Sequence, residues 1–138
     1  MNKLLCLEEF CYTVTMEMKL EVVPLSVSDV DRSIAFYKNK AGFNLDHDVL
    51  PGNGMRIVQL TPPGSACSIV FGRGMGDDSA NLGSIKNLHL VVKDIDAVRA
   101  DLVGRGIDVS GVNDMGGVKY AYFEDPDGNS WALQEIAG

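Results

Sequence analysis

Two stretches of the chain repeat the same order of hydrophobic and polar positions. In each, a short apolar run rich in β-branched residues precedes an aspartate and then apolar residues at helical spacing. The two aspartates, Asp29 and Asp94, lie 65 residues apart, and two later turn glycines, Gly64 and Gly128, lie 64 residues apart. This nearly constant spacing indicates one supersecondary unit that is used twice.

Local signals divide each unit into a strand, a helix and three further strands. Asp29 and Asp94 are typical N-caps, and Gly42 and Gly106 are of the type that ends a helix. Short runs bounded by turn residues predict three strands in each half. They are expected at residues 43–49, 55–60 and 66–71 of the first half and at 107–112, 118–124 and 130–135 of the second.

The pattern therefore predicts an α+β fold of two βαβββ modules. We expect an N-terminal extension at residues 1–18, a first module at 19–71, a linker at 72–86 and a second module at 87–138. The extension matches nothing later in the chain. It is open to interpretation as an edge strand, a helix or residues upstream of the natural start.

The charge balance narrows the range of partners. Of 138 residues, 19 are acidic and 12 basic, which gives a net charge of -7. Nucleic acid and anionic membranes both require a positive face, so neither is an expected partner. No apolar run approaches the roughly 20 residues that span a bilayer. The cysteines, Cys6, Cys11 and Cys67, are odd in number, which predicts reduced thiols in a cytoplasmic protein.

Two segments carry a family resemblance. Residues 24–37 read PLSVSDVDRSIAFY and residues 123–135 read FEDPDGNSWALQE. Together they resemble the vicinal-oxygen-chelate superfamily, which includes glyoxalase I, extradiol dioxygenases and bleomycin-binding proteins. The resemblance covers residues 19–136 and implies a curved mixed sheet around a small-molecule cavity. Because this fold hosts several chemistries, it implies a cavity and not a particular reaction.

The resemblance also indicates where metal ligands would stand. The family's metal enzymes carry ligands on the first and last strands of each module, which here correspond to Val22, Ser68, Asn87 and Ala132. Valine and alanine have no donor atom, and serine and asparagine are weak neutral ligands. We therefore expect no family metal site and no cofactor, which disfavours metal-dependent isomerisation and dioxygenation.

Strand alternation assigns further side chains to the cavity face. The predicted ligand-binding residues are Val22, Pro24, Ser26, Arg56, Ser68, Asn87, His89, Tyr120, Tyr122, Ala132 and Gln134. The tyrosines offer area for stacking, and Arg56 offers a charge for an acidic group. His89 is a candidate general acid or base, and equally a wall residue that orients a ligand. His47, between two aspartates, is interpreted as a strand-edge residue because neighbours on a strand point to opposite faces.

These residues predict a metal-free binding protein that sequesters or carries a small organic molecule. The resemblance to the bleomycin-binding branch, whose cavity lies at a dimer interface, implies a homodimer. The alternative is a lyase, isomerase or dioxygenase-type enzyme that uses non-standard metal ligands or His89 as acid or base. A regulatory or interaction domain is a third hypothesis, favoured if side chains fill the cavity.

Overall fold

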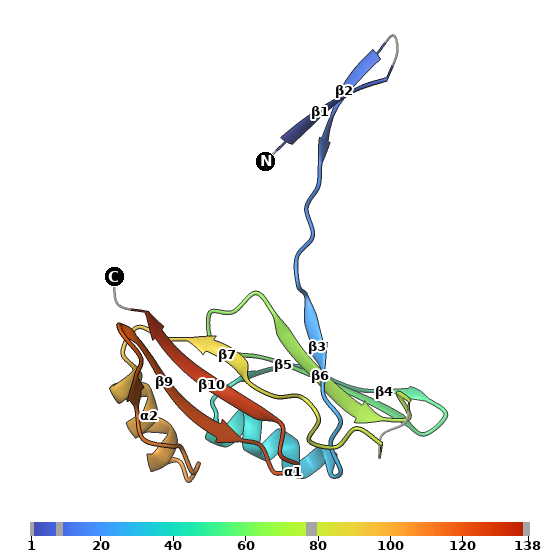
Figure 1. Cartoon of the computed structure of the whole chain (residues 1–138). Helices are drawn as coiled ribbons and strands as arrows, with labels where there is room; N and C mark the ends of the chain where they lie inside the picture. The colour runs from blue at the N-terminus through green and yellow to red at the C-terminus, as the bar shows by residue number, and fades with distance from the viewer. Residues whose placement is uncertain (1, 8–9, 77–79, 137–138) are drawn as a thin grey trace.

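A computed structural model of the chain describes residues 2–7, 10–76 and 80–136. It confirms the predicted α+β fold: the described residues form two four-stranded mixed sheets, helical segments and a small two-stranded sheet (Figure 1). Within these residues, no helix is long and apolar enough to cross a membrane.

The first sheet has the strand order β3-β6-β5-β4. Its strands are β3 (Val22–Pro24), β4 (Asn44–Gly52), β5 (Met55–Thr61) and β6 (Ser68–Arg73). β3 runs parallel to β6, and the other neighbours are antiparallel. The strands fall within a few residues of the expected ones, because glycine and proline turn residues mark where each strand ends.

The second sheet repeats this topology in the order β7-β10-β9-β8. Its strands are β7 (Leu88–Val91), β8 (Asn113–Asp114), β9 (Val118–Glu124) and β10 (Ser130–Ile136). We refer to β3–β6 with their helix as the first module and to β7–β10 with theirs as the second module. The same relative strand order in both sheets is the structural counterpart of the sequence repeat.

The strand expected at residues 107–112 is wrong, since only the two residues of β8 pair with β9. Upstream of them the Ser110 side chain intervenes: Tyr122 N–H donates to Ser110 Oγ at 2.9 Å, while Ser110 N–H donates to Tyr122 O at 2.9 Å. A side-chain oxygen here accepts a bond that a strand would take on its backbone, so this segment forms no regular ladder.

The helices begin at the predicted caps. Asp29 Oδ1 accepts from Arg32 N–H at 3.1 Å before α1 (Val30–Ile34), and Asp94 Oδ1 accepts from Ala97 N–H at 3.1 Å before α2 (Ile95–Gly104). α1 continues as the π-helical turn η1 (Ala35–Lys40). Gly42 has a φ of 80°, a left-handed conformation that glycine adopts at little cost after a helix.

One hydrophobic core serves both modules. Ring contacts cross between them: Tyr37 and Phe43 lie 5.8 and 5.4 Å from Trp131, and Phe36 lies 6.3 Å from Phe123, measured between centroids. Because both sheets turn one face toward this shared core, the apolar residues of each module are buried in part by the other.

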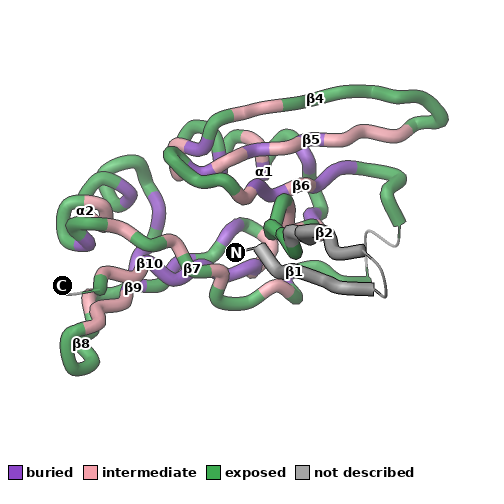
Figure 2. The backbone as a smooth tube through the Cα atoms, turned by 90° about the horizontal axis from the view of Figure 1, so that it is seen from above, coloured by how far each residue is buried: buried purple, intermediate pink, exposed green. Residues whose placement is uncertain are grey.

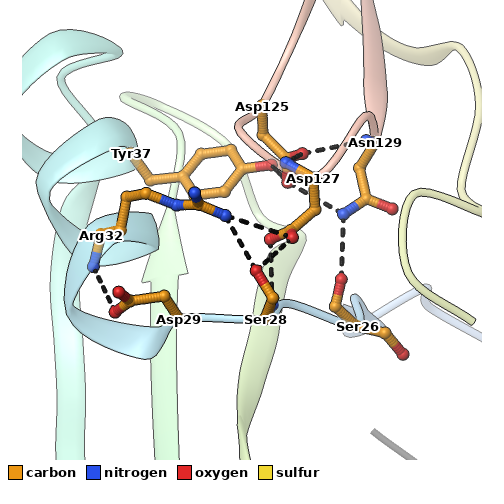
Figure 3. Close-up of polar contacts among 8 residues, drawn as sticks. All are labelled: Ser26, Ser28, Asp29, Arg32, Tyr37, Asp125, Asp127 and Asn129. Atoms are coloured by element: carbon orange, nitrogen blue, oxygen red, sulfur yellow. Dashed lines mark hydrogen bonds and ion pairs between the residues drawn. The ribbon is translucent and has the colours of Figure 1, made fainter. Parts of the chain in front are cut away.

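A polar network also joins the modules (Figure 3). The buried turn of the second module places Asp125 against the hydroxyl of Tyr37 at 2.8 Å. Asn129 Nδ2 donates to Asp125 Oδ2 at 2.9 Å and to the Ser26 carbonyl at 3.2 Å. Ser28 Oγ donates to Asp127 Oδ1 at 2.6 Å. The Asp-Pro-Asp-Gly-Asn turn thus holds the second module against the first.

The N-terminal residues form a hairpin of their own and not an edge strand of a larger sheet or a helix, the structures considered for them. β1 (Asn2–Leu7) pairs antiparallel with β2 (Phe10–Thr15), and neither pairs with the two larger sheets. Residues 16–21 link this hairpin to the first module without forming a strand. In Figure 1 the hairpin stands away from the body of the molecule.

Candidate functional site

Each sheet has one face outside the shared core, and these open faces form the candidate site. Figure 2 shows the two sheets side by side, with buried residues along β6 and β10 and mostly exposed residues along β4. On the second sheet, the register aligns His89, Ala132 and Tyr122 in one row and Val91, Gln134 and Tyr120 in the next. This face carries most of the residues predicted from the second module.

Two tyrosines form an aromatic platform on the second sheet. The rings of Tyr120 and Tyr122 lie nearly parallel, 6.2 Å apart at 8°. His89 meets Tyr120 edge-on at 5.9 Å and 82°, and Gln134 Nε2 donates to the Tyr120 hydroxyl at 3.1 Å. Tyr122 remains 39% exposed and Val91 69% exposed, so a ligand can reach the platform. Flat aromatic area held in place by polar partners is suited to stacking a planar group.

His89 is held in one orientation by the backbone. Its Nδ1 lies 2.7 Å from the carbonyl oxygen of Asn87. Because a carbonyl only accepts, Nδ1 donates, and the neutral ring keeps its lone pair on Nε2. His89 lines a cavity of about 220 Å³ with Ser68 and Cys67. The ring therefore offers this space one hydrogen-bond acceptor or base.

Asn87 does not take the position expected for it. The residue beside Ala132 on β7 is His89, whereas Asn87 precedes the strand with a φ of 57°. Its N–H donates to Ser130 Oγ at 2.8 Å. The equivalent row of the first module pairs Val22 with Ser68. Counting seven residues back from the capping aspartate fails because the connection between first strand and helix is two residues shorter in the second module.

The open face of the first sheet carries a polar network. Thr61 Oγ1 donates to Asp46, so the 2.6 Å contact between Thr61 and Ser68 has Ser68 as its donor. Asn44 Nδ2 donates to Asp46 Oδ1 at 2.7 Å. The hydrogen bond from Thr61, more than any other contact, lowers the pKa of Asp46. The face therefore presents an ionised carboxylate and, at Ser68, a hydroxyl with free lone pairs.

Asp46 lies at a β-bulge that strand alternation does not predict, and Thr61 lies one residue beyond the strand expected at 55–60. The register of β4 against β5 shifts between Leu45 and His47, which leaves Asp46 unpaired and turns Asp46 and His47 to the same face. Simple alternation holds for Asp48, which lies opposite the buried Val58. A bulge of this kind leaves no signal in a single sequence.

Arg56 lies on the opposite face from the one expected. Its guanidinium donates to Asp48 from Nε at 2.9 Å and from Nη2 at 2.8 Å, and Nη1 donates to Asp31 of α1 at 3.0 Å. In the register of β5 against β6, Arg56 lies opposite Arg73 and Val58 lies opposite Phe71. Arg56 and Val58 therefore share the face of β5 that turns toward the helices. The prediction was wrong because alternation alone does not say which face of β5 meets the core, and Val58 and Leu60, which alternate with Arg56, are buried there. Arg56 is tied into a structural ion pair that lowers the pKa of Asp48.

The remaining predicted residues, Val22, Pro24 and Ser26, lie on β3 or just after it. Val22 is half-buried and Pro24 exposed, on the face opposite the core residue Leu25. Pro24, Ser26 and Val70 line a cavity of about 180 Å³. These residues are separated from the Tyr120 platform along the sheets, so they form a second part of the open surface.

The residues at the expected ligand positions do not fit a divalent metal ion. Val22 and Ala132 have no donor atom, and Ser68 offers only a neutral hydroxyl oxygen, which is a weak ligand for a divalent ion. His89 contributes one ring nitrogen, whereas a stable site needs three or more good donors. In the part of the chain that the structure describes, no group of three or more His, Cys, Asp or Glu side chains is placed to hold a metal.

Comparison with known proteins gives one family and several similar structures. Residues 19–133 match the model of the Glyoxalase/Bleomycin resistance protein/Dioxygenase superfamily. The antibiotic binding protein TnmS3 from Streptomyces sp. CB03234 is 31% identical, with 90% of this chain and 100% of that chain covered and a TM-score of 0.77.

A glyoxalase/bleomycin resistance protein from the same Streptomyces strain is 33% identical, covering 83% and 98% of the two chains at a TM-score of 0.69. A superfamily member from Sphaerobacter thermophilus DSM 20745 is 29% identical, covering 88% and 99% at a TM-score of 0.76. No curated protein matches the chain.

Proposed function

Because the chain belongs to the Glyoxalase/Bleomycin resistance protein/Dioxygenase superfamily, we propose that it binds a planar organic molecule on the open faces of its sheets. The observation that carries the proposal is the accessible stacked pair of Tyr120 and Tyr122, braced by His89 and Gln134. The similarity to a protein described as antibiotic binding supports a sequestering or carrying role.

The polar network of the first sheet adds a preference for hydrogen-bond donors. The Asp46 carboxylate and the lone pairs of Ser68 accept hydrogen bonds but offer no free donor of their own. A ligand with an amine or hydroxyl beside its planar part satisfies both faces. The negative net charge of the chain, -7, favours a cationic ligand over an anionic one on this surface.

We further propose that the protein acts in the cytoplasm as a homodimer. Residues 16–21 alternate apolar and charged side chains, and Met16, Met18 and Leu20 are 67%, 88% and 71% exposed. An exposed apolar row of this kind gains stability when a second chain covers it. Light scattering on the purified protein tests this: a mass of twice 14.9 kDa supports the proposal, and a monomer at micromolar concentration contradicts it.

The test of binding uses proflavine, a planar fluorescent cation, as the probe. We expect a saturable rise in fluorescence polarisation that is unchanged by EDTA, and no competition from cyclohexylamine, which has the charge without the flat ring. Loss of binding on adding EDTA would refute a metal-free site, and the absence of saturable binding would refute the proposed planar site.

One observation favours a second candidate, a metal-independent enzyme. The fixed tautomer of His89 leaves Nε2 as a base beside a cavity. For this candidate, His89→Gln abolishes turnover of any converted ligand, whereas proflavine, which keeps both tyrosine rings to stack on, loses only part of its affinity. Full turnover by the variant would exclude His89 as the acid or base.

A further inference from the structure

A separate cavity lies on the helix side of the second sheet, and of the residues in the two open-face rows its lining includes only Val91. It has a volume of about 380 Å³, within the usual range for small-molecule pockets. It opens between α2 and the proline turn after β5. Its apolar lining is formed by Phe43, Leu90, Val98, Leu102, Phe123 and Leu133.

The apolar residues that line the cavity face the core, but some of them remain partly exposed to solvent. Leu102, Phe123 and Leu133 are 5% or less exposed, whereas Leu90 and Val98 are only half-buried although both pack against the core. The neighbouring first module supplies Pro62 as a wall and leaves this gap unfilled. Apolar surface left open in this way is stabilised by an apolar guest.

The mouth of the cavity has a positive balance. It carries Lys93, Arg105 and Asp101, two cations against one anion, on a chain whose net charge is -7. Arg105 pairs with Asp101 at 3.1 Å, but Lys93 makes no ion pair or hydrogen bond with the residues that the structure describes. The adjacent Asp94 carboxylate is engaged in capping α2. Lys93 is therefore free to receive an anionic group.

We propose that this cavity binds an amphipathic organic anion, with its apolar body between Phe43, Val98 and Leu133 and its carboxylate at Lys93. The site differs from the planar-ligand site in place and in charge preference. The inference therefore stands independently of the function proposed above.

The chain carries its own reporter for this site. Trp131 is the single tryptophan, and its ring stacks on Phe123, a wall of the cavity, at 6.3 Å and 8°. Titration with decanoate is expected to change tryptophan fluorescence saturably. Decanol should bind about three- to tenfold more weakly because it lacks the charge that pairs with Lys93. Equal affinity for the two, or no saturable change, would overturn the proposal.

Variants locate the binding. Lys93→Gln should weaken decanoate about three- to tenfold and leave decanol unchanged, since only the ion pair is lost. Lys19→Gln, on the N-terminal segment, is the matched control because Lys19 is 83% exposed and does not line the cavity. Val98→Trp, which fills the cavity, should abolish decanoate binding while proflavine binding persists. Unchanged decanoate affinity in Lys93→Gln, or displacement of proflavine by decanoate, would contradict a separate anion site.

Discussion

The hydroxyl of Tyr37 donates a 2.8 Å hydrogen bond to Oδ2 of Asp125, so the helix of the first module is tied to the turn of the second (Figure 3). Trp131 Nε1 donates to the same hydroxyl at 3.1 Å. Burial raises the pKa of Tyr37 far above its ordinary value, so the phenol stays protonated and remains a donor. The hydroxyl oxygen of Tyr37, in the first module, thus makes two hydrogen bonds to residues of the second module.

Replacing Tyr37 by phenylalanine should destabilise the protein by about 1–3 kcal/mol, because Asp125 and Trp131 each lose a buried partner. Urea unfolding measures the change. Tyr122→Phe is the control: its ring is 39% exposed and should change the free energy of unfolding by about 0.5 kcal/mol or less. Equal effects of the two substitutions would show that the Tyr37 hydroxyl does not join the modules.

Gly83 should not tolerate a side chain. A Cβ there would lie 2.3 Å from the backbone oxygen of Asp127, and its φ of 67° is left-handed. Gly116 has a similar φ of 76° but open space around it, so it isolates the conformational effect. We expect Gly116→Ala to cost about 1–2 kcal/mol and Gly83→Ala clearly more, as measured by urea unfolding. Similar costs would mean that the close approach to Asp127 relaxes freely.

Acid should weaken the link between Arg56 and Asp48. The hydrogen bond from Arg56 holds the pKa of Asp48 below its ordinary value, so its contribution to stability is present at neutral pH and is lost as pH falls through the folded-state pKa. At pH values below about 4, the melting temperature of the protein should therefore fall. Asp48→Asn should make that drop shallower, and an unchanged pH profile in this variant would exclude the pair as a contributor.

The fold was predictable because its signals are local. The N-caps Asp29 and Asp94 and the repeated turns act within a few residues, and their spacing reveals the second copy of the module. The aromatic row was predictable for the same reason, since Tyr120 and Tyr122 share a face by alternation alone.

Two errors at the site concern register across strands, and one concerns the length of a connection. The bulge at Asp46 and the facing of Arg56 depend on which backbone groups pair, and Asn87 is displaced because the connection from β7 to α2 is two residues shorter than its counterpart. That pairing is decided by tertiary packing over many residues. The missing strand at residues 107–112 has a similar cause. There the Ser110 side chain accepts a hydrogen bond from Tyr122 that a backbone carbonyl would accept in a regular strand.

The most direct test of the central claim is the affinity of proflavine for Tyr122→Ala compared with Val103→Ala. Tyr122 belongs to the platform, whereas Val103 is a comparably exposed apolar residue of α2, at 44% against 39%. Loss of a stacking ring should weaken binding about tenfold in Tyr122→Ala, with no change in Val103→Ala. Equal affinity in both variants and the wild-type protein would contradict a planar-ligand site on the open face of the second sheet.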